Sequence, residues 1–149
     1  MDAVQASIVA QGGYDWQNFR SVRTPQKAAC AAFLREACSN GSQVQSSAMQ
    51  FWLSYEFNAN KSGVNLTSFA MDLGVFLAAR GPYAWLGHGW KGCSQNYPFP
   101  QEFNLDYGEP VGGQVCAETG SGTGVFEREY TKASVRMDCN SWTPTITMK

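Results

Sequence analysis

The clearest hydrophobic pattern lies between residues 49 and 90, where a helical period is flanked by two aromatic runs. From Leu66 to Arg80, apolar side chains recur every three or four positions, which predicts a helix that Gly81-Pro82 ends. The runs 49–56 and 83–90 are rich in aromatic residues, which favour strands. A strand, a helix and a strand in this order predict a βαβ unit with parallel strands and a right-handed crossover.

Two shorter elements are expected before this unit. The apolar run Ala6–Ala10 predicts a strand. Thr24-Pro25 predicts the start of a helix, with Thr24 as N-cap and Pro25 at the first helical position. One helical stripe follows, which consists of Cys30, Phe33, Leu34 and Ala37. Asn40-Gly41 is expected to end this helix.

The pattern changes after Cys93, where a long connection rich in proline and aromatic residues runs to Pro110. The segments 125–130 and 134–139 then alternate between apolar and polar side chains. This alternation predicts an antiparallel hairpin that turns near Thr131-Lys132, and residues 145–148 are expected to add a third strand. The chain is therefore predicted to contain a parallel α/β part followed by a small antiparallel part.

Composition excludes several classes of protein. The 149 residues are 44% hydrophobic and 15% charged, with a net charge of −1, so a packed domain is expected rather than a disordered chain. The basic residues are scattered, which argues against nucleic-acid binding. No apolar run reaches the roughly 20 residues that cross a bilayer, and no basic and apolar leader follows Met1.

Cysteines and glycosylation sequons indicate an extracellular or secretory-pathway protein. The chain has five cysteines and three Asn-X-Ser/Thr sequons, at Asn40, Asn60 and Asn65. These features without a signal peptide favour a chain whose true N-terminal part is absent, with Met1 internal.

The cysteine spacing limits the disulfide pairs. If Cys30 and Cys38 lie on one helix they are about 12 Å apart, which is too far for a bridge. A bridge between Cys93 and Cys116 would close the proline-rich connection, and it is our prediction. Cys139 would then pair within the antiparallel part or with a missing segment.

Three segments resemble the C-terminal portion of glycoside-hydrolase-like proteins, which are (β/α)8 barrels. They are Arg80–Trp90, Asp106–Pro110 and Val125–Ala133, and the likeness spans roughly residues 48–147. The resemblance implies that 49–56 and 83–90 are the seventh and eighth barrel strands, with Ala6–Ala10 as the sixth.

The implied fold class is α/β, a partial (β/α)8 barrel followed by a small antiparallel sheet. Residues 1–92 would hold the C-terminal βα units, and residues 93–149 the connection and the antiparallel appendage of the same domain. The first five βα units, and most of an active site, would be missing.

Glycoside hydrolysis needs two carboxyl groups, which in a barrel lie at the C-terminal ends of strands. Glu56 is the carboxylate at such an end, so it is the catalytic candidate; an ordinary exposed glutamate is the alternative. Asp72 lies in the predicted helix and is expected to be solvated. Glu127 and Glu129 share one strand face, which is typical of an exposed surface near Arg or Lys.

Substrate contacts would come from aromatic side chains and from His88, the single histidine. The apolar faces of sugar rings stack on aromatic rings, but core packing is the more common role of such residues. The candidates for substrate binding are Trp52, Tyr83, Trp85, His88 and Trp90. For His88 the alternative is a turn or core histidine. No metal-ligand motif or cofactor motif is found.

Three functions remain open from the sequence. The leading hypothesis is the C-terminal part of a glycoside-hydrolase-like protein, which contributes carbohydrate contacts and is inactive without its N-terminal half. A non-catalytic, secreted carbohydrate-binding or adhesion module is the second. A structural fragment without activity is the third.

Overall fold

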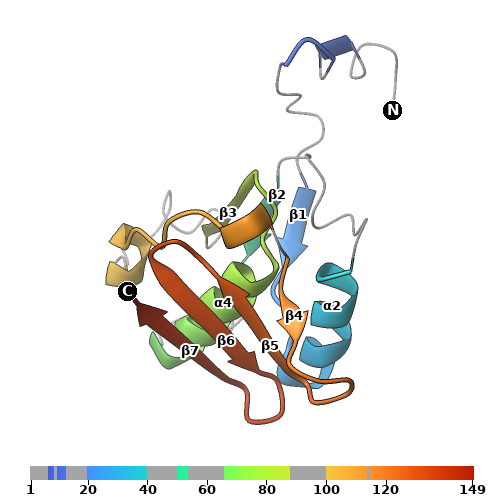
Figure 1. Ribbon diagram of the computed structural model, residues 1–149, viewed down its shortest axis with the longest axis vertical. Helices are drawn as coiled ribbons and strands as arrows, with labels where there is room; N and C mark the ends of the chain where they lie inside the picture. Colours follow the sequence, from blue (N-terminus) through green and yellow to red (C-terminus); the bar gives the residue numbers. More distant parts are fainter. Residues whose placement is uncertain are drawn as a thin grey trace, which may run out of the picture.

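The computed structural model describes residues 7–8, 10–12, 20–39, 50–53, 66–87, 100–113 and 115–149, which form two sheets and two longer helices (Figure 1). A parallel sheet has the order β1-β2-β3, with β1 Arg20–Arg23, β2 Gln50–Leu53 and β3 Ala84–Gly87. An antiparallel sheet has the order β4-β5-β6-β7, with β4 Ala117–Glu118, β5 Val125–Glu129, β6 Ala133–Asp138 and β7 Thr143–Met148. The α-helices are α2 Cys30–Ala37 and α4 Leu66–Ala79. Short 3-10 turns are η2 Lys27–Ala29, η4 Gln101–Asn104 and η5 Val111–Gly113.

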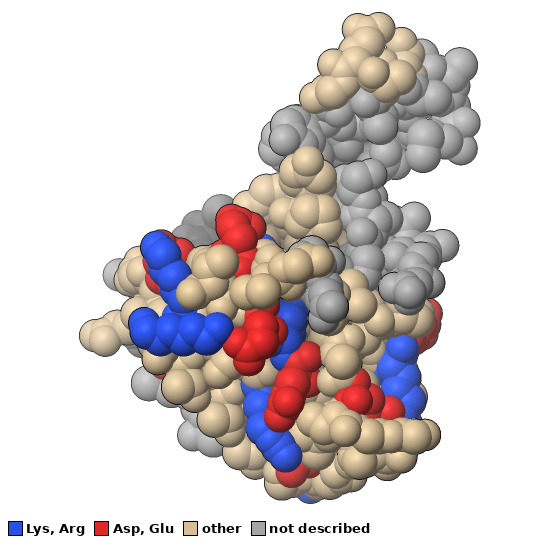
Figure 2. All heavy atoms as spheres, viewed as in Figure 1, with Lys and Arg blue, Asp and Glu red and all other residues tan. Residues whose placement is uncertain are grey.

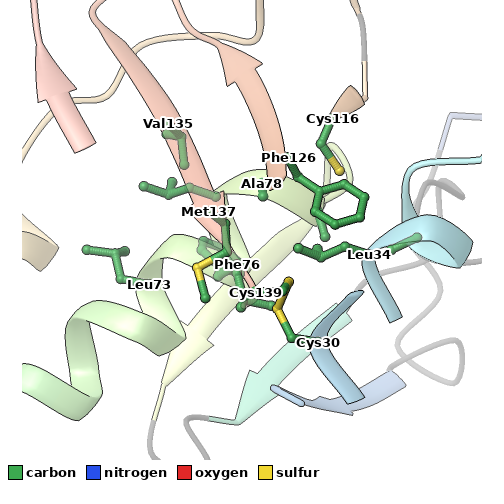
Figure 3. Packing of buried hydrophobic residues seen from close by; sticks show 14 of the residues in the cluster. Cys30, Leu34, Leu73, Phe76, Ala78, Cys116, Phe126, Val135, Met137 and Cys139 are labelled. Atoms are coloured by element: carbon green, nitrogen blue, oxygen red, sulfur yellow. A yellow bond between two sulfur atoms is a disulfide. The ribbon is translucent and has the colours of Figure 1, made fainter. Parts of the chain in front are cut away.

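The two helices lie between the two sheets. On one side, the ring of Trp52 in β2 makes edge contacts at 5.7 Å with Phe33 of α2 and with Phe76 of α4. On the other side, α4 packs against β5, β6 and β7. A Cβ atom on Gly74 would lie 2.5 Å from Cβ of Pro144 in β7, so this helix approaches the sheet closely. The result is three layers, and the core spans both sheets (Figures 1 and 3).

The predicted helix at 66–80 is confirmed, but it is buried on nearly all sides. Every residue from Asp72 to Ala79 is buried, because a sheet covers each side of the helix. Asp72 is fully buried and accepts a hydrogen bond from Oγ1 of Thr24 at 2.7 Å, so the expectation of a solvated Asp72 is wrong. Thr24 therefore does not cap a helix: the first turn begins after Gln26, which makes no side-chain cap.

The predicted antiparallel hairpin and its third strand are confirmed. Val125–Glu129 pairs with Ala133–Asp138, which pairs in turn with Thr143–Met148. Alternation places one set of side chains toward α4, and these are Phe126, Arg128, Tyr130, Val135 and Met137. The opposite face carries Glu127 and Arg136, which form an exposed ion pair at 3.4 Å.

The predicted bridge between Cys93 and Cys116 is wrong, because Cys116 pairs with Cys38. A second disulfide joins Cys30 to Cys139, across 109 residues of sequence, so Cys139 pairs neither within the antiparallel part nor with a missing segment. The Cα–Cα distances are 5.1 Å and 5.5 Å. Both bridges connect α2 to the antiparallel part, since the layers bring segments far apart in sequence into contact. Cys93 lies outside the described residues.

The expected partial (β/α)8 barrel is also wrong, and the chain is a small, mixed α/β fold. The runs at 49–56 and 83–90 do pair in parallel, as predicted, although β2 and β3 each span only four residues. In a barrel the helices form the outer layer. Here an antiparallel sheet of four strands covers the other side of α4. Ser7, Ile8 and Ala10 are helical, so the strand expected at 6–10 is not formed.

A charged pair next to the Cys38–Cys116 bridge should make stability depend on acid pH. Arg35 of α2 donates two hydrogen bonds to the Glu118 carboxylate, at 2.8 and 3.0 Å. These bonds, together with the backbone N–H of Gly124, lower the pKa of Glu118 from 4.5 to about 2. A lowered carboxyl pKa contributes stability that is complete above pH 4.5 and is lost as pH falls toward 2.

We therefore expect the melting temperature to fall between about pH 4.5 and pH 2, and to fall less steeply in Glu118→Gln. Circular dichroism melts across this range measure it. Glu36→Gln, on the exposed side of α2, should keep the wild-type slope. Equal slopes in the wild type and in Glu118→Gln would contradict this role for the pair.

Candidate functional site

A groove of about 340 Å³ opens beside β3, the edge strand of the described parallel sheet. Its size lies within the range of small-molecule sites. One wall is β3, the floor is the last two turns of α4, and the other wall is the segment 102–108. The floor is apolar, while the rim carries the charged and aromatic residues Arg80, Trp85, Glu102, Asp106 and Tyr107.

The wall at 102–108 is held by its own side chains and by the core. Oη of Tyr107 donates a hydrogen bond to the backbone carbonyl of Glu102 at 2.8 Å, which closes the segment on itself. The ring of Phe103 packs on Phe69 of α4, with 4.9 Å between centroids. The Asp106 carboxylate accepts a hydrogen bond from the N–H of Gly108 at 2.9 Å. This wall is therefore fixed to the floor of the groove.

The same wall docks on the turn of the β5–β6 hairpin. Thr131 and Glu109 exchange two hydrogen bonds, at 2.9 and 3.1 Å, and the N–H of Lys132 donates to the carbonyl of Tyr107 at 3.3 Å. Gly108 has φ +77°, and a Cβ atom there would lie 2.9 Å from the nitrogen of Lys132, so this position requires glycine. The motif segments at 106–110 and 130–132 therefore form one structural unit.

Arg80 is positioned by residues that cap the C-terminus of α4. The guanidinium of Arg128 is buried and donates to the carbonyls of Leu77, Ala78 and Arg80, at 3.4, 3.2 and 2.7 Å. Tyr130 donates through Oη to the carbonyl of Leu77 at 2.6 Å and accepts from Nε of Arg80 at 3.2 Å. The last carbonyls of the helix are thereby satisfied, and the Arg80 side chain is held at the groove.

The two carboxylates that line the groove, those of Asp106 and Glu102, differ in their hydrogen-bond partners. The Asp106 carboxylate pairs with the ammonium of Lys132, and this hydrogen bond, with that from Gly108, lowers the pKa of Asp106. Burial, and then the charge of Glu102, raise the pKa of Tyr107 to about 12, so its hydroxyl stays protonated at neutral pH. Oε2 of Glu102 is shielded from solvent and has no hydrogen-bond partner among the described residues.

The structure brings one predicted substrate contact, Trp85, to this groove. Trp85 is 51% exposed and lines the groove. Trp52, in contrast, is 0% exposed, and its Nε1 donates to Gln50 in the core at 3.3 Å, so it cannot contact a sugar in this fold. The pairing of β2 with β3 explains the difference, because Trp85 is paired with Phe51. Trp52 follows Phe51 in β2, so its side chain points to the opposite face of the sheet, toward the helices. Tyr83 is half-buried and does not line the groove.

Several predicted residues lie outside the described residues, namely Glu56, His88, Trp90 and the sequon residues Asn40, Asn60 and Asn65. Glu127 is exposed and pairs with Arg136. Glu129 is exposed and pairs with Lys149, so both match the charged surface that was expected. Acidic and basic side chains alternate over the face drawn in Figure 2, without a patch of one sign.

Glu102 was not among the residues predicted for a site, and Arg80 was given no part in one. A signal was present, because Glu102 lies four residues before the motif segment Asp106–Pro110. The sequence did not show that α4 forms the floor beside these residues, because this depends on contacts between distant segments.

No protein-family model matches this sequence, and a search of curated proteins finds no match. The resemblance to glycoside-hydrolase-like proteins thus stays a prediction from short motifs. In the parts of the chain that the structure describes, no helix has the length and apolar character to cross a bilayer. Two disulfides are present, which is typical of proteins from oxidising compartments.

Proposed function

We propose that this chain is a non-catalytic, extracellular carbohydrate-binding module whose site is the groove beside β3. The observation that carries the proposal is the groove's rim, where the exposed Trp85 lies with Arg80, Glu102 and Tyr107 above an apolar floor. Sugars combine apolar C–H faces with hydroxyl groups, so they suit a site with aromatic surface and polar hydrogen-bonding groups. The two disulfides favour an extracellular location.

Binding is a better conclusion than hydrolysis for this fold. The hydrolase hypothesis depended on carboxylates at the ends of barrel strands, and the partial barrel is not formed. Two carboxylates line the groove, and that of Asp106 already forms an ion pair with Lys132. The wall at 102–108 suits a preformed binding site, because its hydrogen bonds are made within the chain.

Retention of the purified chain on insoluble cellulose, xylan, chitin and starch tests this proposal. The wild type should bind at least one of them, and Trp85→Ala should weaken that binding at least tenfold. Met148→Ala is the matched control, because Met148 is an apolar side chain with 43% exposure on β7 that does not line the groove. Equal losses in the two variants, or no retention of the wild type, would overturn the proposal.

A further inference from the structure

The strand β7 lies at the outer edge of the antiparallel sheet (Figure 1). Within the described residues, β6 is its one strand neighbour. Four of its six residues are exposed, and these are Thr143, Thr145, Thr147 and Met148. Proteins commonly protect such an edge with charged side chains or with a bulge. β7 has no charged side chain and pairs with β6 through six consecutive residues, so it has neither of these protections.

The hydrogen bonds to β6 decide which backbone groups of β7 point to the open edge. The N–H of Lys149, just after β7, donates to the carbonyl of Lys132 at 2.9 Å. Hydrogen-bonded pairs alternate along an antiparallel ladder, so the three threonines of β7 also bond to β6. The residues between them direct their backbone groups away from β6, and these are Pro144, Ile146 and Met148. Proline has no N–H, so the donors at this edge are the N–H groups of Ile146 and Met148.

These backbone groups fit those of a second copy of β7 in an antiparallel pair. With the two-fold axis at Ile146, the two Ile146 residues exchange two hydrogen bonds. Each Met148 N–H then meets the Pro144 carbonyl of the other copy, so a proline stands where only an acceptor is needed. Moving the axis by one residue in either direction leaves Pro144 or Met148 without a partner in β7.

The side chains also suit a pair of identical strands. In the same register, Thr145 of one copy lies opposite Thr147 of the other, and cross-strand threonine pairs are favourable. The ammonium of Lys149 donates to the Glu129 carboxylate of its own chain at 2.7 Å and to the carbonyl of Tyr130 at 2.8 Å. Two copies of β7 therefore meet without like charges opposite each other.

We infer that β7 binds a second copy of this chain, so that two antiparallel sheets join into one continuous sheet centred on Ile146. Each copy contributes its four strands to this sheet. The inference does not depend on the proposed carbohydrate site. A contact made by one strand from each copy is at the small end of interface sizes, so we expect a dissociation constant on the order of 100 μM.

Sedimentation velocity of the purified chain tests the inference. Between roughly 5 and 500 μM, a range set around the expected dissociation constant, the average mass should rise from that of one chain toward that of two. Iodoacetamide treatment beforehand prevents Cys93, which belongs to neither bridge, from linking two copies covalently. A chain that stays monomeric over this range would overturn the inference and leave β7 open to a strand from another protein.

Two double variants with matched positions test the register. Thr145→Glu with Thr147→Glu places like charges opposite each other in the pair and should weaken the dimer at least tenfold. Thr145→Glu with Thr147→Lys places opposite charges there and should preserve the dimer. Both positions are exposed, so both variants should fold, which circular dichroism melts check. Equal dimerisation of the two variants, whether strong or weak, would contradict pairing through β7 in this register.

Discussion

Replacing both Cys30 and Cys139 by serine should lower the free energy of unfolding by about 4–5 kcal/mol, which is a large part of the stability of a domain of this size. The bridge spans 109 residues, so it removes much of the freedom of the unfolded chain. It also ties α2 to the end of β6 inside the core, where both cysteines are buried (Figure 3).

Equilibrium unfolding in guanidinium chloride, with far-ultraviolet circular dichroism as the signal, measures the loss. Cys93→Ser is the control, because Cys93 belongs to neither bridge, and it should leave the midpoint unchanged. Peptide mapping under non-reducing conditions should recover Cys30 with Cys139 and Cys38 with Cys116. Recovery of Cys93 linked to Cys116 would contradict the structure.

Arg128→Met should cost about 3 kcal/mol of stability. The substitution keeps the apolar volume of the side chain but removes the donors to three carbonyls at the end of α4. Buried acceptors without donors are costly, and the neighbouring Tyr130 already uses its hydroxyl proton on Leu77. Urea unfolding curves of the wild type and the variant give the difference.

Arg136→Met is the matched control for this prediction. Arg136 lies on the opposite face of the same sheet, where its pair with Glu127 is exposed and contributes little. Its unfolding midpoint should stay close to that of the wild type. If the two variants lose similar stability, Arg128 does not act as a cap for α4.

Local patterns predicted the elements well because each depends on neighbouring residues. Alternation at 125–130 and 134–139 gave the hairpin, and the apolar period at 66–80 gave α4. The parallel pairing of β2 with β3 followed from the helix between them. These predictions needed no knowledge of how the layers pack.

The arrangement of the elements could not be predicted, because it depends on contacts between distant residues. The spacing of apolar residues at 66–80 did not reveal that α4 is covered on both sides, so Asp72 was expected to be exposed to solvent. The cysteine spacing correctly excluded a bridge between Cys30 and Cys38. The pairs that do form depend on the packing of α2 against the antiparallel part. For the site, Trp85 was predicted, whereas Glu102 reaches the groove only because the segment 102–108 packs on α4.

An amide chemical-shift titration of the 15N-labelled chain with cellobiose, xylobiose, chitobiose and maltose tests the central claim most directly. We predict saturable shifts at the indole N–H of Trp85, at Arg80 and along residues 102–108, and none at Glu127 or Arg136 on the outer face of β5 and β6. Shifts confined to that outer face, or no shifts at millimolar sugar, would contradict the assignment of a carbohydrate site to the groove beside β3.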